Sequence, residues 1–330
     1  MTMRKFCMQR SKMRAACVVA AMAFAGLVVA SDRAGAETTL RVGKAQANQF
    51  AFVPADVGAD TGIFKKHGID VEISNFGGDA KEIQALTAGS IDIALGGGPA
   101  LATIVKGVPM KAVAAEANAP NTIMLVVLKD GPVKTVSDLK GRIVTVSTAG
   151  SLTYWLTQQL SRAQGWGDDG IKITPLGSAD AQIAALKTHQ IDGVTTDSVS
   201  VYKFVETGDG RILEKFGDTI KDFHVHLIYA SDALIAGNPT ALKAFLAGWF
   251  ETIAYMRDHR QETIGVAVQH TGVSPAVAGA GYDDTMPILS TDGRFNPKAL
   301  AVLAKSFVEL NTLPAEPDMS KLYTEAFLPK

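Results

Sequence analysis

The strongest constraint on the fold is a segment whose residues recur one hundred positions later. Each copy reads as a short helical pattern followed by an apolar run, and this alternation of helix and strand predicts βαβ units with parallel sheets. Six residue pairs share the offset of 100: Gly77/Gly177, Ile83/Ile183, Ala85/Ala185, Leu86/Leu186, Ile91/Ile191 and Asp92/Asp192. The recurrence predicts two similar α/β lobes.

Further strand and helix patterns suggest how the chain passes between these lobes. Strands are expected at 39–43, 69–73, 91–95, 110–115 and 122–128, and in the second lobe at 142–146, 171–174 and 192–195. One more strand at 224–230 is followed only by helices, which we expect to wrap the first lobe. The predicted crossings lie near 129–134 and 221–223, where they would form a hinge. The expected divisions are therefore 37–130, 131–222 and 223–330.

Residues 1–36 have the pattern of a secretory signal peptide. A positively charged start is followed by an apolar run at 15–30 and by the small residues Ala34-Gly35-Ala36. The run of about 16 residues is short for a membrane span, which needs roughly 20. Cleavage after Ala36 and a periplasmic location are expected, with a retained anchor as the alternative.

Composition after the leader excludes several classes of protein. Cys7 and Cys17 both lie in the leader, so the mature chain would have no disulfide, no thiolate nucleophile and no cysteine-ligated metal. From residue 37 onward there are 26 basic and 32 acidic residues, without a basic cluster. This balance argues against nucleic acid as a partner.

Segments 60–72, 83–94, 106–113 and 238–275 resemble periplasmic solute-binding proteins of the sulfonate, nitrate and taurine uptake systems. These proteins share a superfamily with pyrimidine-precursor-binding proteins, and the likeness covers about Leu40 to Gly281. The resemblance implies a type II two-lobed receptor that delivers its ligand to an ABC permease. It also implies that the permease and its ATPase are separate chains, and that the receptor is a monomer without a cofactor.

In the first lobe, two loops follow expected strands, where ligands of open α/β sheets are held. The first loop offers the side-chain amides of Gln46, Asn48 and Gln49, and Phe50 is expected to cover an apolar part of a solute. The second loop is glycine-rich: Gly97 and Gly98 allow close backbone approach. The helix expected after this loop would favour a negative group at its free amides.

The second lobe offers a matching set of loops. Thr148, Gly150 and Ser151 precede a helix that carries Tyr154 and Trp155, so its hydroxyls and amides suit an anion. The last strand of the lobe is followed by further candidates. Together with one residue after the fourth strand of the first lobe and one histidine expected to line the inter-lobe region, they complete the predicted site: Thr195, Thr196, Asp197, Asn118 and His226.

No metal or catalytic site is predicted. His224 and His226 alternate on an expected strand and would point to one face, but no third ligand is evident nearby. No Gly-x-Ser-x-Gly motif is present.

The expected function is capture of a small anionic organic solute for an uptake transporter. None of the predicted loops contains Lys or Arg, so an anion would be held by neutral donors and helix dipoles, and a neutral or zwitterionic solute remains open. Tyr154, Trp155 and Phe50 leave an aromatic or heterocyclic solute as an alternative. A pyrimidine-synthesis enzyme on the same fold and an accessory protein of a two-component sensor are more distant alternatives.

Overall fold

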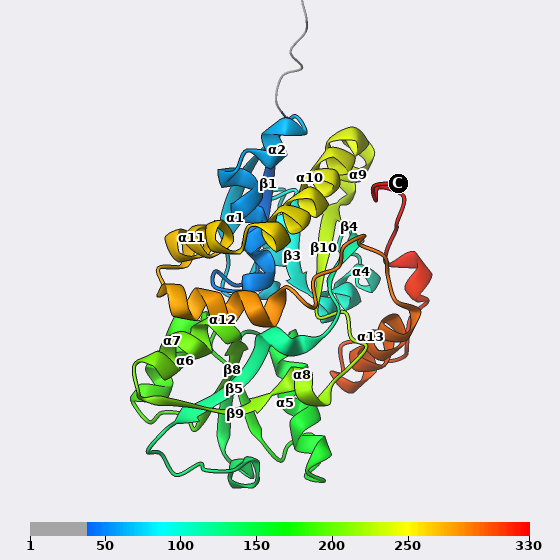
Figure 1. Ribbon diagram of the computed structural model, residues 1–330. Helices are drawn as coiled ribbons and strands as arrows, with labels where there is room; N and C mark the ends of the chain where they lie inside the picture. Colours follow the sequence, from blue (N-terminus) through cyan, green and yellow to red (C-terminus); the bar gives the residue numbers. More distant parts are fainter. Residues whose placement is uncertain (1–37) are drawn as a thin grey trace, which may run out of the picture. The chain divides into compact units, whose positions relative to one another are not determined.

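The computed structural model describes residues 38–330, so the expected leader and its cleavage site lie outside the described residues. The described chain has a mixed α/β fold with two five-stranded sheets, one in each of two lobes (Figure 1). No helix in this part of the chain combines the length and apolar character needed to cross a bilayer.

The first sheet has the strand order β2-β1-β3-β10-β4. β1 (Thr38–Lys44) pairs in parallel with β2 (Ile69–Asn75) and β3 (Ile93–Gly97). β10 (His226–Ser231) enters antiparallel between β3 and β4 (Met110–Ala117). Every residue of β3 and β10 is buried, as expected of strands in the middle of a covered sheet.

The second sheet repeats this arrangement with the order β7-β6-β8-β5-β9. β6 pairs in parallel with β7 and β8, and β5 enters antiparallel between β8 and β9. The strands are β5 (Ile123–Leu128), β6 (Ile143–Val146), β7 (Lys172–Pro175), β8 (Gly193–Asp197) and β9 (Gly210–Lys215). The predicted pair of similar α/β lobes is confirmed.

The recurrent aspartates explain why the sequence echo exists. Asp92 accepts hydrogen bonds from the Arg41 amide at 2.9 Å and from its guanidinium at 2.6 Å. Asp192 likewise accepts from the Ile143 amide at 2.9 Å and from the Arg142 guanidinium at 3.3 Å. In the first lobe this carboxylate ties the turn before β3 to β1, and in the second lobe it ties the turn before β8 to β6.

The first crossing differs from the prediction. β5 was expected in the first lobe, but it pairs with β8 and β9 of the second, so the chain crosses at 118–122 and not at 129–134. A division at residue 130 is therefore wrong. An apolar run such as Ile123–Leu128 fits the interior of either sheet, and only its long-range pairing decides between them. The return runs through 220–225, between α8 (Phe216–Thr219) and β10, and it includes the predicted 221–223.

Helices cover both sheets and form the C-terminal tail (Figure 1). In the tail, α10 packs on α1 and α2, and α11 packs on α1, so both belong to the first lobe. Bounds of the remaining helices are α1 (Val53–Asp60), α2 (Ile63–Lys66), α3 (Asp79–Thr87), α4 (Ala102–Val105), α5 (Leu152–Ala163), α6 (Ala179–Lys187), α7 (Ser198–Glu206), α9 (Asp232–Gly237), α10 (Pro239–Asp258), α11 (Arg260–Thr271), α12 (Pro275–Thr285) and α13 (Pro297–Glu309).

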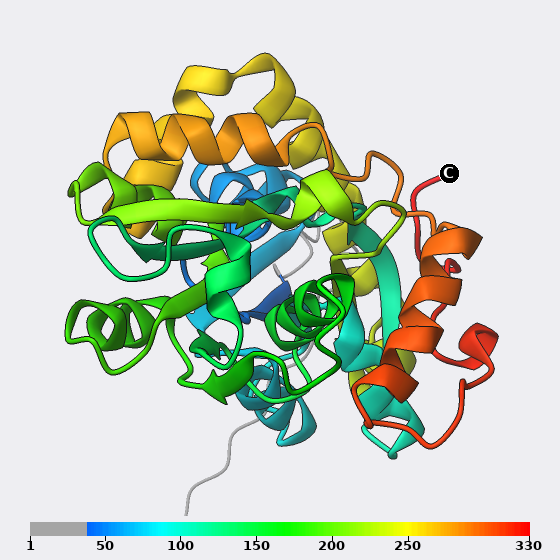
Figure 2. The ribbon, with the colours of Figure 1, turned by 90° about the horizontal axis from the view of Figure 1, so that it is seen from below.

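The end of the tail also contacts the second lobe, which the expectation of a wrap around the first lobe did not include. α12 packs on α7, where the Tyr202 hydroxyl donates to Asp284 at 2.6 Å. α13 lies on the other side of the molecule (Figure 2). There Glu309 accepts from the Trp155 indole at 2.9 Å and from Gln159 at 2.8 Å. The tail therefore joins the two lobes at two separate places.

A buried ion pair fixes the end of β1. Lys44 is the one lysine or arginine that is buried among residues 38–330, and its ammonium lies 2.7 Å from the Asp56 carboxylate of α1. Both side chains are 3% exposed. The pair holds α1 against the strand that leads into the loop beginning at Ala45.

Removing one partner of this pair tests its role. Lys44→Met leaves the Asp56 charge buried without its cation, and we expect a loss of about 3–5 kcal/mol of unfolding free energy. Lys44→Met combined with Asp56→Leu should recover most of that loss, since no buried charge remains. Urea denaturation measures both. Lys65→Met is the control, because Lys65 and Asp70 form an exposed pair at 3.8 Å, for which we expect a change within about 0.5 kcal/mol. Equal effects of Lys44→Met and the control would contradict this role.

Candidate functional site

A small cavity of about 30 Å³ lies between the two lobes. Its walls come from the chain just beyond the carboxyl ends of β1, β3, β6 and β8, and from β10 and the first crossing. This is where ligands bind in open α/β sheets. The lining residues are Ala45, Gln46, Gln49, Phe52, Asp79, Gly97, Ile123, Ser147, Leu152, Thr153, Thr196, Asp197 and His226.

The first lobe contributes a pair of polar side chains with unused hydrogen-bonding atoms. Gln49 and His226 are 2% and 3% exposed, and Gln49 Nε2 lies 3.2 Å from His226 Nε2. Gln49 Oε1 and His226 Nδ1 have no partner. Burial lowers the pKa of His226 to about 3, so its ring is neutral. Whichever way the Gln49 amide is turned, the pair presents one free donor and one free acceptor.

The second lobe contributes hydroxyl groups, but several of these are bonded to one another. Ser147, Ser151 and Thr153 lie within 3.0–3.1 Å of each other through their oxygens. Ser151 also caps α5 by accepting from the Tyr154 amide at 3.3 Å. This cluster therefore organises the start of α5 while Ser147 and Thr153 line the cavity.

Carboxylates occupy the place where the sequence suggested an anion. Asp79, at the start of α3, accepts from the Gly97 amide at 2.6 Å, and the Gly98 amide donates to the Val225 carbonyl at 3.1 Å. The Gly97 and Gly98 amides are thus bonded within the protein. Asp197 reaches the cavity from the second lobe and caps α7 by accepting from the Ser200 amide at 2.8 Å.

Two further acidic groups lie behind Asp79. Glu82 accepts from the Leu95 amide at 3.1 Å through Oε1, while its Oε2 has no partner. Glu116 on β4 is fully buried, and neither of its carboxylate oxygens has a partner. Burial raises the pKa of Asp79 and Asp197, and raises those of Glu82 and Glu116 much further. These carboxyl groups therefore hold their protons more tightly than exposed ones, and the cavity lining contains no lysine or arginine to offset their charge.

Six of the predicted site residues line the cavity, and contact with a ligand stays a prediction for each. They are Gln46, Gln49, Gly97, Thr196, Asp197 and His226. Three others, Thr148, Gly150 and Ser151, line a neighbouring cavity of about 250 Å³ that also reaches Asp79.

The remaining predicted residues lie elsewhere. Asn48 donates to Ser200 at 3.2 Å and so joins the lobes, and Phe50 packs edge-on against Tyr282 in the core. Thr195 accepts from the buried hydroxyl of Thr157. Tyr154 is partly buried on α5, outside the cavity lining, while Gly98 and Asn118 contact the return segment at Val225 and His224.

His224 and His226 do not share surroundings, because β10 begins only at His226. His224 lies against Asn118 and Asn296, away from the cavity. Within residues 38–330 no group of three His, Cys, Asp or Glu side chains is arranged to hold a metal ion.

Sequence reasoning missed several lining residues. Asp79 has no distinctive signal, because an acidic residue in the first turn is ordinary helix chemistry. Phe52 lines the cavity where Phe50 was expected, and its ring meets His226 edge-on at 4.9 Å. Ile123 was missed because the crossing was placed too late. Ser147 and Thr153 lie in or near a loop that was recognised, but were not selected.

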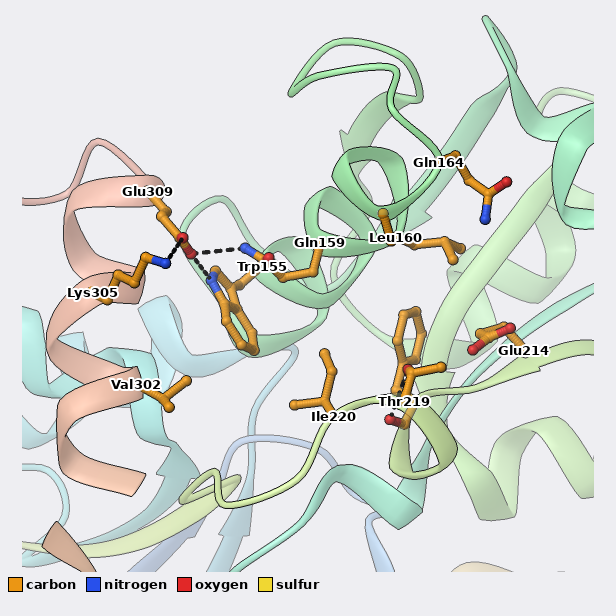
Figure 3. Close-up of a pocket in the computed structure, with 12 residues that line it drawn as sticks. Trp155, Gln159, Leu160, Gln164, Glu214, Thr219, Ile220, Val302, Lys305 and Glu309 are labelled. Atoms are coloured by element: carbon orange, nitrogen blue, oxygen red, sulfur yellow. Dashed lines mark hydrogen bonds and ion pairs between the residues drawn. The ribbon is translucent and has the colours of Figure 1, made fainter. Parts of the chain in front are cut away.

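A larger cavity of about 420 Å³ lies between α5, α8 and α13 (Figure 3). Apolar side chains such as Val302 and Ile220 form much of its wall, and Glu309 on its rim is bonded to Trp155 and Gln159. The smaller cavity is the better candidate, because it lies at the strand ends of both sheets and contains buried polar atoms without partners.

The NMT1/THI5-like family model matches residues 49–263. The chain belongs to this family. An aliphatic sulfonates-binding protein of Escherichia coli K12 is 28% identical over 206 residues, which cover 62% of this chain and 63% of that protein, less than two thirds of its length.

Solved structures share the fold of this NMT1/THI5-like protein at low identity. The alkanesulfonate-binding protein of Xanthomonas axonopodis pv. citri, bound to MOPS, has a TM-score of 0.76 and 18% identity, over 87% of this chain and 98% of that one. The periplasmic nitrate-binding protein of Synechocystis PCC 6803 has a TM-score of 0.71 and 16% identity, over 88% and 87%. The family resemblance seen in the sequence is confirmed.

The glycine run can be tested through its packing. A Cβ on Gly98 would lie 2.1 Å from the His224 carbonyl oxygen, which is backbone and cannot move aside cheaply. We expect Gly98→Ala to lower the unfolding free energy by about 2–3 kcal/mol. Gly237→Ala is the control, since nothing lies within 4 Å of its Cβ. Denaturant melts compare the two, and a Gly98→Ala protein as stable as the control would refute the close approach.

The buried Glu116 predicts a pH-dependent stability. Burial raises the pKa of Glu116 in the folded protein well above the ordinary 4.5. The folded state is therefore favoured while Glu116 is protonated. The contribution of Glu116 to the unfolding free energy is highest below pH 4.5 and falls as pH rises through the folded pKa. Glu116→Gln cannot ionise. We expect its unfolding free energy, relative to the unsubstituted protein, to be higher at pH 8 than at pH 5.

Glu316→Gln, at an exposed carboxylate, is the control for loss of one charge. Urea melts at both pH values measure the effect. A Glu116→Gln difference that does not change with pH would contradict the assignment of a buried, uncompensated carboxyl.

Proposed function

We propose that the protein is the solute-binding component of an ABC-type uptake transporter and acts in the periplasm. The observation that carries this proposal is the inter-lobe cavity, in which Gln49 and His226 keep one donor and one acceptor without partners. Leaving such groups buried and unbonded costs about 1–3 kcal/mol each. A solute that bonds to them relieves that cost.

Capture follows from the two-lobed arrangement. A solute held by Gln49 and His226 of the first lobe and by Thr196 of the second binds the closed form better than an open one. That difference in affinity is what shifts the population toward closure. The two crossings, at 118–122 and 220–225, are where the backbone would bend. The closed form would then be recognised by a permease, with the permease and its ATPase as separate chains.

The names of the relatives favour sulfonates and nitrate, in line with the small anionic solute expected from the sequence. The lining includes no lysine or arginine, so the charge of the solute needs its own argument. The aromatic alternative loses support, because Phe50 and Tyr154 lie outside the lining and Trp155 faces the larger cavity.

Binding without conversion is the test of this proposal. Purified protein is screened by thermal shift against alkanesulfonates, nitrate, taurine, small amines and pyrimidines, and we expect the melting temperature to rise with one chemical class. Mass spectrometry of the recovered compound should show it unchanged. Conversion to a product would refute the binding role and favour an enzyme.

The compound found in this way then tests the cavity. Gln49→Leu removes both polar atoms of the amide, and we expect about a tenfold weaker affinity from the loss of one hydrogen bond. Gln84→Leu, on the exposed face of α3, is the matched control. Equal affinities of the two variants would move the binding site away from this cavity.

A further inference from the structure

The cavity is bordered by carboxylates from opposite lobes. Asp79 stands at the start of α3 in the first lobe, and Asp197 is the last residue of β8 in the second. Each already accepts a backbone N–H, at 2.6 Å and 2.8 Å. A carboxylate has about four lone-pair sites, so both retain capacity for further donors.

No positive group of the described chain balances these two carboxylates. The buried Lys44 is paired with Asp56, and the lining itself holds no lysine or arginine. His226 is the remaining basic side chain of the lining, and its ring is neutral because burial lowers its pKa to about 3. A bare anion in this space would meet carboxyl groups from both lobes and no lysine or arginine.

A second, independent observation points to a ligand in the same space. The Gln49–His226 pair is buried, lines the cavity and keeps a free acceptor. The hydroxyls of Thr196 and Thr153 lie on the opposite wall. A nitrogen that carries several N–H groups suits this set of acceptors, since an ammonium has three donors and no acceptor.

We propose that the solute carries a protonated nitrogen, which Asp79 and Asp197 hold between the two lobes. This inference rests on the proposed solute-binding function and specifies its substrate class as small cations or zwitterions. The uncharged hydroxyls and the free donor of the Gln49–His226 pair are left to hold the rest of the solute.

Matched probes of similar size separate the classes. Ethanolamine carries the nitrogen alone, taurine carries nitrogen and sulfonate, and ethanesulfonate carries the sulfonate alone. We extend the set with methylammonium, beside an uncharged compound of similar shape. Isothermal titration at pH 7 should show at least tenfold tighter binding for the compound of each pair that carries the protonated nitrogen.

Variants then assign the effect to the carboxylates. Asp79→Asn and Asp197→Asn keep an acceptor oxygen for Gly97 and for the α7 cap, so the fold is retained. Each should weaken binding of the nitrogen compound at least tenfold. Asp169→Asn, at an exposed carboxylate of the second lobe, should leave it unchanged. Circular dichroism confirms folding of each variant.

The outcomes separate the two proposals. Ethanesulfonate binding as tightly as taurine would overturn the protonated nitrogen and leave the solute-binding function intact. The proposal of a protonated nitrogen would also be overturned if Asp79→Asn and Asp197→Asn left the affinity for the nitrogen compounds unchanged. If no compound of any charge binds, the solute-binding function falls and this inference falls with it.

Discussion

The buried pair of Lys44 and Asp56 sets the conditions for the rest of the site. It joins the end of β1 to α1, and the chain that leaves this joint forms the first wall of the cavity. Lys44, the buried cation of the described chain, is thus paired with Asp56 outside the cavity lining. The carboxylates that reach the cavity are left without a positive partner from the protein, and this shapes the chemistry of whatever binds between the lobes.

The glycine run at the end of β3 gives acidic side chains the space to approach the cavity. A Cβ on Gly96 would lie 2.9 Å from Glu82 Oε2, and one on Gly97 would lie 3.2 Å from Asp79 Oδ1. The Tyr229 hydroxyl donates to the Gly97 carbonyl at 2.8 Å. The missing side chains thus make room for the protein's own polar groups. The Gly97 and Gly98 amides, which the sequence offered to an anion, are bonded within the folded chain to Asp79 and to the Val225 carbonyl.

The architecture was largely predictable, because the recurrent Asp92 and Asp192 repeat one hydrogen-bonding task in both lobes. The first crossing was not, since an apolar strand such as Ile123–Leu128 carries no mark of the sheet it joins. Of the thirteen residues that line the cavity, five were predicted from loops after strands, and His226 was predicted from its place on a strand. The other lining residues depend on geometry that the sequence does not reveal. The 3-10 turn at Phe50–Phe52, for example, places the Phe50 ring in the core and the Phe52 ring at the cavity. Asp79 becomes a site residue only because α3 starts beside β3.

The tail gives the two lobes contacts that the solute does not touch. Asp284 meets Tyr202 on one side of the molecule, and Glu309 meets Trp155 on the other. Under the proposed function, separation of the lobes to release a solute would break both of these contacts. The residence time of the solute would then depend partly on α12 and α13, which are remote from the cavity. Substitutions there would change how long the solute is held without changing which solute is chosen.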